Sequence, residues 1–96
     1  MAEYDLLVEQ DALEFINGLG TKSERICKDN LKKLAEDPYP GSGKGDKERL
    51  VVNGVKIYRL HIGRTYTAFY DVDEDAKAIQ VFEVLPIDEA HKRYGH

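Results

Sequence analysis

Arg59 and His61 are the two residues of this sequence whose types and spacing are best suited to chemistry. They lie two residues apart in an alternating, strand-like stretch, and side chains at this spacing point to the same face of a strand. Arginine can hold a phosphate through two hydrogen bonds, and histidine, with an ordinary pKa of about 6.5, can give or take a proton near neutral pH. Arg64 follows at a turn and adds a second permanent cation.

Cleavage of RNA is a reaction that this combination of side chains could carry out. The 2′-hydroxyl of one nucleotide attacks its own phosphate, so an enzyme needs a base, an acid and cations that stabilise the charged phosphorane. His61 could make either proton transfer, and the arginines could contact the phosphate. The alternative is that His61 is a half-exposed strand histidine without a catalytic task, and the pattern leaves both interpretations open.

Metal and thiol chemistry have little support in the sequence. The three histidines, His61, His91 and His96, are not at metal-ligand spacings, and there is a single cysteine, Cys27. A lone cysteine within a helical pattern is typical of a small, partly buried residue. We therefore expect no metal site, no cofactor and no thiol nucleophile.

The charge distribution is uneven and favours a polyanionic partner in one region. The formal net charge is −4, but residues 44–64 contain six basic residues against two acidic ones, a local charge of +4 that leaves −8 for the remainder. A local basic surface can attract a polyanion even when the whole molecule is acidic. We predict RNA contacts from Lys44, Lys47, Arg49 and Lys56, and from Lys92 and Arg93 near the C-terminus. A solvated face without a partner is the alternative.

Length and composition indicate one soluble globular domain spanning residues 1–96. Hydrophobic residues make up 42% and charged residues 33% of the sequence, which is typical of a packed domain and not of a disordered chain. No apolar run approaches the roughly 18 residues of a membrane span, and the N-terminus lacks the pattern of a signal peptide. We expect a cytoplasmic protein with no membrane partner.

Helical patterns dominate the N-terminal part, after a predicted first strand over residues 3–8. Asp11 is a plausible N-cap of a short first helix, which the glycines at 18 and 20 would end. Thr21, with Glu24 three residues later, matches a capping box and predicts a second helix with one apolar side. The two helices should form a hairpin with a shared apolar seam.

Strand patterns dominate the C-terminal part. A strand over 49–52 leads to Asn53-Gly54, a strong type I′ turn signal, and a ribbon over 55–70 turns at Gly63. A last strand over 78–85 and a short helix over 87–94 follow. The sequence therefore predicts an α+β fold: a mainly antiparallel sheet of about four strands with the helical hairpin on one face. The other face should be exposed and carry Arg59 and His61.

This arrangement resembles the RelE/ParE superfamily of toxins. The resemblance rests on Tyr58-Arg59-Leu60-His61-Ile62-Gly63, then Tyr66 and Tyr70, then Val84-Leu85-Pro86 and Tyr94. Asp37-Pro38 and Asn53-Gly54 fall in the right order, so it extends over the whole chain. It implies a RelE-like fold and a cognate RelB-like antitoxin. In the RelE branch it implies metal-independent cleavage of mRNA on the ribosome and hence inhibition of translation, whereas the ParE branch inhibits DNA gyrase.

The resemblance also implies roles for particular residues. Arg59 and His61 match two alternating strand positions that are usually basic in the family, and Tyr94 matches a C-terminal tyrosine that carries a proton in some RelE toxins. The implied catalytic set is Arg59 and Arg64 on the phosphate, with His61 and Tyr94 exchanging protons. Lys56 lies near another lysine position of the family.

Two departures from the family pattern leave three functions open. Thr67 stands where the family has an arginine, and Pro86-Ile87-Asp88 stands where many active members have an arginine or lysine. Arg64, with Lys92 or Arg93, could supply charge from nearby positions. The three functions are a ribosome-dependent endoribonuclease, a catalytically inactive RelE-like binding protein, and a ParE-like gyrase inhibitor.

Overall fold

The protein forms a five-stranded sheet with helices on both sides. The computed structural model describes residues 4–41 and 46–94, with the backbone alone for residues 46, 93 and 94. In chain order the elements are β1 (Asp5–Val8), α1 (Gln10–Asn17), α2 (Thr21–Leu34), β2 (Asp46–Val52), β3 (Val55–Ile62), β4 (Tyr66–Asp73), β5 (Ala78–Pro86) and α3 (Ile87–Tyr94). The strand order is β1-β5-β4-β3-β2, and every neighbouring pair is antiparallel except the parallel pair β1 and β5. The predicted α+β class is confirmed.

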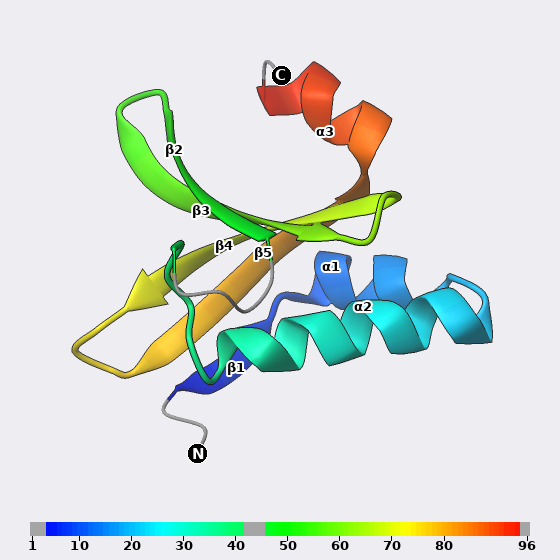
Figure 1. Ribbon diagram of the computed structural model, residues 1–96, viewed down its shortest axis with the longest axis horizontal. Coiled ribbons are helices and arrows are strands. Elements are labelled where there is room, and N and C mark those ends of the chain that lie inside the picture. The colour runs from blue at the N-terminus through cyan, green and yellow to red at the C-terminus, as the bar shows by residue number, and fades with distance from the viewer. Residues whose placement is uncertain (1–3, 42–45, 95–96) are drawn as a thin grey trace.

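The main core lies between one face of the sheet and the first two helices. Figure 1 shows α1 and α2 on one side of the sheet and α3 on the other. Cys27, Leu31 and Leu34 recur at the spacing of one helical face, so α2 turns these buried residues toward the sheet. Leu60 and Ile62 of β3 meet them from the sheet side. The predicted helical hairpin therefore packs on one face of the sheet, as expected from the sequence.

The second face of the sheet is partly covered, contrary to the expectation of an exposed face. Ile57, Phe69 and Ala90 form a second, smaller buried cluster, with Leu50 and Leu85 among the residues packed around it. Ala90 belongs to α3, which folds back over the sheet (Figure 1). The physical reason is that this face carries apolar side chains as well as Arg59 and His61, and burying them is favourable. Arg59, on the same face, is only 8% exposed.

The turns between strands follow the sequence, whereas both helix starts differ by a residue or more. Asn53 and Gly54 have φ values of 52° and 80°, as a type I′ turn requires, and Gly63 has 60°. The predicted capping box at Thr21 is wrong: α2 begins at Thr21, its N-cap is Gly20, and no side chain caps it. Helix α1 likewise begins at Gln10 and not after Asp11.

Within the part of the chain that the structure describes, no helix combines the length and apolar character needed to cross a membrane.

Candidate active site

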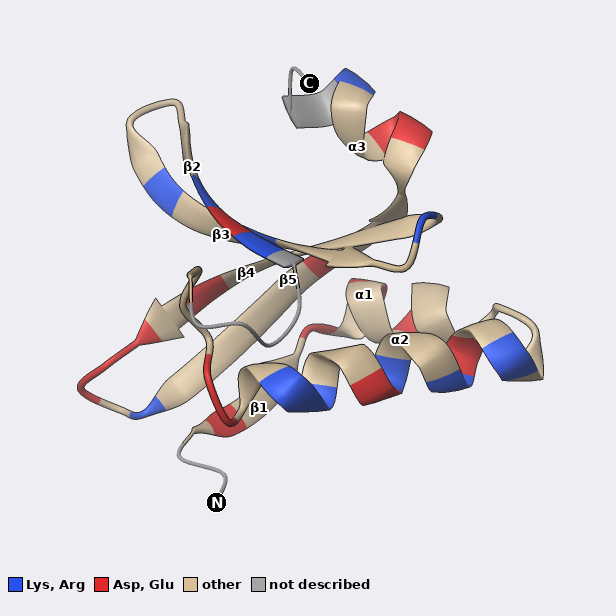
Figure 2. Ribbon diagram, in the orientation of Figure 1, with Lys and Arg blue, Asp and Glu red and all other residues tan. Residues whose placement is uncertain are grey.

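Glu48, Arg59 and His61 form a cluster near the end of the β2–β3 ribbon that lies away from the Asn53-Gly54 turn, and we call it the Arg59 cluster. Glu48 and Arg59 are direct partners in the antiparallel pairing, so their side chains lie on the same face of the sheet. The Arg59 Nη2 donates to Glu48 Oε1, and His61 Nε2 lies 3.8 Å from the same oxygen. Figure 2 shows acidic and basic positions side by side on these two strands. One carboxylate thus faces both predicted catalytic side chains.

The three side chains differ in depth. Arg59 is 8% exposed, and Phe69 is its partner on β4. The side chain of His61 is 27% exposed and that of Glu48 is 46% exposed. Among the described residues, the Arg59 Nε is the one buried side-chain nitrogen or oxygen without a hydrogen-bond partner. The guanidinium therefore lies at the bottom of the cluster with unused donor capacity, while the imidazole and the carboxylate lie at its rim.

Thr67 lies directly across from His61 on β4, and it is the residue where the sequence resemblance led us to expect an arginine. Its side chain shares the face of the Arg59 cluster, and the residue is only 1% exposed. A buried threonine adds no charge there. The cations of the cluster are therefore Arg59 and, when protonated, His61.

Arg64 lies at the end of the same ribbon, in the exposed turn between β3 and β4. The chain enters α3 beside this turn, because the Ile87 amide donates to the Thr65 carbonyl at 2.9 Å. Arg64, Pro86 and Asp88 help to line a shallow hollow at this junction. Tyr94 lies at the C-terminal end of α3, and its side chain is outside the described residues.

Strand alternation separates the other predicted RNA-binding residues from the Arg59 cluster. Arg49 pairs with Tyr58, and Lys56 pairs with Val51, so both exposed cations lie on the face that α1 and α2 cover. Lys92 is exposed on α3. Lys44 and the side chain of Arg93 lie outside the described residues.

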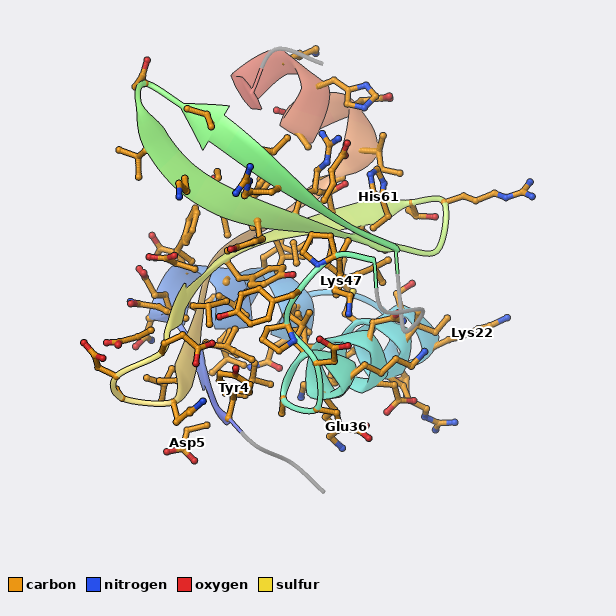
Figure 3. The ribbon with its side chains drawn as sticks, turned by 60° about the vertical axis from the view of Figure 1, so that its left-hand side comes forward. Tyr4, Asp5, Lys22, Glu36, Lys47 and His61 are labelled. Atoms are coloured by element: carbon orange, nitrogen blue, oxygen red, sulfur yellow. The ribbon has the colours of Figure 1, made fainter. Side chains whose placement is uncertain are left out.

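Lys47 is directed into the molecule. It is 8% exposed, and its ammonium donates to the Asp37 carbonyl at 2.7 Å. Burial lowers the pKa of this lysine, because removing an ammonium from water disfavours the charged form. Figure 3 shows Lys47 on the α2 side of the sheet and His61 on the α3 side. The structure thus brings Arg59 and His61 together and places Lys47 apart from them.

Glu48 is the member of the cluster that the sequence interpretation missed. A signal for it was present. Because Asn53-Gly54 forms a two-residue turn, Val52 must pair with Val55, and counting outward from that pair sets Glu48 opposite Arg59. The register of the hairpin therefore could have placed a carboxylate beside the candidate phosphate-binding arginine.

The described residues contain no group of three or more histidine, cysteine, aspartate or glutamate side chains positioned to hold a metal ion.

The fold and the arrangement of its layers are those of RelE-like toxins. The RelE–RelB complex from Pyrococcus horikoshii contains a chain that matches with a TM-score of 0.72 and 22% identity, over 88% of this chain and 94% of that one. The RelBE2 toxin–antitoxin complex of Mycobacterium tuberculosis matches with a TM-score of 0.72 and 14% identity, over 85% and 95%.

A further similar structure is a YoeB/ParE toxin from Agrobacterium tumefaciens, with a TM-score of 0.66 and 17% identity over 83% of this chain and 94% of that chain. No protein-family model matches the sequence, and the search of curated proteins found no match. The similarity therefore lies in the fold, and the functional argument depends on the site.

Proposed function

We propose that this protein is a RelE-like toxin that cleaves mRNA on the ribosome and thereby inhibits translation. The observation that carries the proposal is the placement of Arg59 and His61 side by side on one sheet face of a RelE-like fold. A buried guanidinium with an unused N–H beside a partly exposed imidazole provides a phosphate ligand next to a proton carrier.

The proposed reaction uses side chains of this chain. Arg59 holds the scissile phosphate and stabilises the charge that develops on it, with Arg64 adding a second cation from the turn. His61 transfers one of the two protons, either from the attacking 2′-hydroxyl or to the departing 5′-oxygen. Tyr94, from the end of α3, transfers the other. Exposed cations at Arg49, Lys56 and Lys92 contact phosphates of the message or of the ribosome.

The proposed protein partner is a RelB-like antitoxin. Two of the similar structures are RelE–RelB-type complexes, which supports the proposal by analogy of fold. An acidic segment of such a partner suits the exposed cations Arg49 and Lys56, and apolar residues suit the surface near Tyr39 or a sheet edge. A pull-down from the native host that recovers no small acidic protein would count against this partner.

A catalytically inactive RelE-like binding protein is the second candidate, and two observations favour it. Glu48 already pairs with Arg59, and Thr67 contributes no charge where the family pattern has an arginine. A ParE-like gyrase inhibitor is a third candidate, because the fold is also similar to a YoeB/ParE toxin. Gyrase inhibition would produce DNA-damage signalling without loss of mRNA.

Induced expression of single variants tests the proposal. Arg59→Ala and His61→Ala are expected to abolish growth arrest and mRNA cleavage, because each removes one half of the proposed chemistry. His91→Ala is the matched control, since it removes an exposed histidine on α3 outside the Arg59 cluster. Circular dichroism of each purified variant checks that the fold is retained. Full toxicity of folded Arg59→Ala and His61→Ala proteins would refute these assignments.

A further inference from the structure

We propose that Glu48 occupies, in the RNA-free protein, the place that an RNA phosphate takes on Arg59, so that Glu48 must be displaced before the phosphate binds. This inference rests on the proposed function and adds a residue that controls access to the site. Glu48 would act as an internal competitor for the phosphate and would not take part in proton transfer.

The first argument is the chemistry of the contact. A carboxylate oxygen and a phosphate oxygen are both anionic acceptors, and guanidinium groups bind both in the same planar geometry. Glu48 Oε1 accepts from Arg59 Nη2 and lies 3.8 Å from His61 Nε2. One oxygen therefore stands where the proposed mechanism needs a phosphate oxygen, between the arginine and the histidine.

The second argument is the unequal burial of the two partners. Arg59 is held in place by its surroundings, whereas almost half of the Glu48 side chain is exposed to solvent. When the pair separates, the carboxylate can turn into water at little cost, but the guanidinium remains buried and must be paired by another anion. The exposed partner is thus the one that leaves, and the buried one is left as a receptor.

The third argument is the unused donor on Arg59. Its Nε–H is buried and has no partner in the described structure, so Glu48 satisfies the guanidinium only in part. A phosphate with several acceptor oxygens could accept from both Nη2 and Nε, which a carboxylate held from β2 does not do here. This difference gives the phosphate an advantage over Glu48 once it arrives.

Inorganic phosphate is the simplest probe, with the Nε–H signal of Arg59 followed by NMR as phosphate is added. Removing one like charge from the binding position should strengthen phosphate binding in Glu48→Gln by roughly tenfold over the unaltered protein. The amide oxygen of glutamine can still accept from Arg59, which favours a folded variant. Glu89→Gln, with the same loss of charge on exposed α3, should stay within about twofold of the unaltered protein.

A second measurement needs no variant. In the unaltered protein, phosphate should shift the Arg59 Nε–H signal and the side-chain carboxyl carbon of Glu48 with the same midpoint. Movement of the Arg59 signal alone would overturn the proposal. A phosphate affinity of Glu48→Gln equal to that of the unaltered protein, or equal to that of Glu89→Gln, would overturn it as well.

The proposed function is tested separately, by measuring binding of a 2′-O-methyl RNA oligonucleotide and cleavage of the unmodified oligonucleotide. Stronger phosphate binding in Glu48→Gln without any RNA binding or cleavage would leave the competition established and contradict the proposed function. RNA cleavage by the unaltered protein, combined with no gain of affinity in Glu48→Gln, would support the proposed function and overturn the role of Glu48. A Glu48→Gln protein that binds RNA as tightly as the unaltered protein but no longer cleaves it would also overturn the role of Glu48 as a competitor, since a proton-transfer role would then explain the carboxylate.

Discussion

Arg59 combines two properties that seldom occur together, a buried permanent charge and an unsatisfied donor. A buried charge is stabilised by pairing, and here the pairing comes from Glu48, a side chain that water can reach. The stability of the protein should therefore depend on the two partners unequally, although both belong to the same ion pair.

We predict that Glu48→Ala destabilises the protein more than Arg59→Met does. The first change leaves a buried guanidinium unpaired, at a cost of about 1–3 kcal/mol. The second leaves an exposed carboxylate, which water solvates, and the methionine stem keeps the packing, so the cost should be below about 1 kcal/mol. Urea unfolding of the two variants measures both values. Equal losses, or a larger loss for Arg59→Met, would contradict this account of the pair.

The β2–β3 hairpin is the element that fixes the Arg59 cluster. Its register follows from the two-residue turn at Asn53-Gly54, because a shift by one residue would send Glu48 and Arg59 to opposite faces. The Arg59 cluster therefore depends on the positive φ angles of Asn53 and Gly54, although this turn lies several residues away from it.

We predict that Gly54→Ala destabilises the protein by about 1 kcal/mol or more, because its φ of 80° is unfavourable for a residue with a Cβ. Gly18→Ala is the matched control: Gly18 has a φ of −83° at the end of α1, and alanine fits there. Thermal unfolding of the two variants provides the comparison. Similar losses at both positions would show that the turn conformation is not the cause.

The sequence predicted the elements better than it predicted their surroundings. The turns at Asn53-Gly54 and Gly63 and the last strand were readable because glycine, asparagine and alternation have local physical causes. The burial of Arg59 was not readable, because it arises from tertiary packing on a sheet face where Ile57, Phe69 and Ala90, far apart in the chain, form a buried cluster. The burial of Lys47 was not predicted either, because its ammonium donates to a backbone carbonyl in a loop.

At the scale of the whole molecule, Glu74 joins the turn between β4 and β5 to two segments that lie far from it in the sequence. Its carboxylate accepts from Tyr39 in the loop after α2, from Tyr4 before β1 at 2.6 Å, and from Lys77 at 2.9 Å. These hydrogen bonds, that of Tyr39 foremost, lower the pKa of Glu74 from 4.5 to about 2. These hydrogen bonds connect the turn between β4 and β5 to the segment before β1 and to the loop after α2.

This network predicts a loss of stability in acid. Because the folded-state pKa is below the unfolded one, the contribution of Glu74 is complete above about pH 4.5 and is lost as pH falls toward about 2. Glu74→Gln should therefore be less stable near neutral pH and lose less stability between these pH values than the unaltered protein. Urea midpoints measured across this range test the point, with Asp75→Asn on the same turn as control. Parallel acid profiles for the unaltered protein and Glu74→Gln would refute it.

The central claim, that this RelE-like fold carries an RNA-cleaving site at Arg59 and His61, is tested most directly by primer extension on a defined mRNA in a translating extract. The unaltered protein should create new 5′ ends inside ribosome-bound codons, and the His61→Ala protein should not. Intact message at high concentrations of folded, unaltered protein would contradict the claim and favour the inactive binding protein, with Glu48 and Thr67 as its physical explanation.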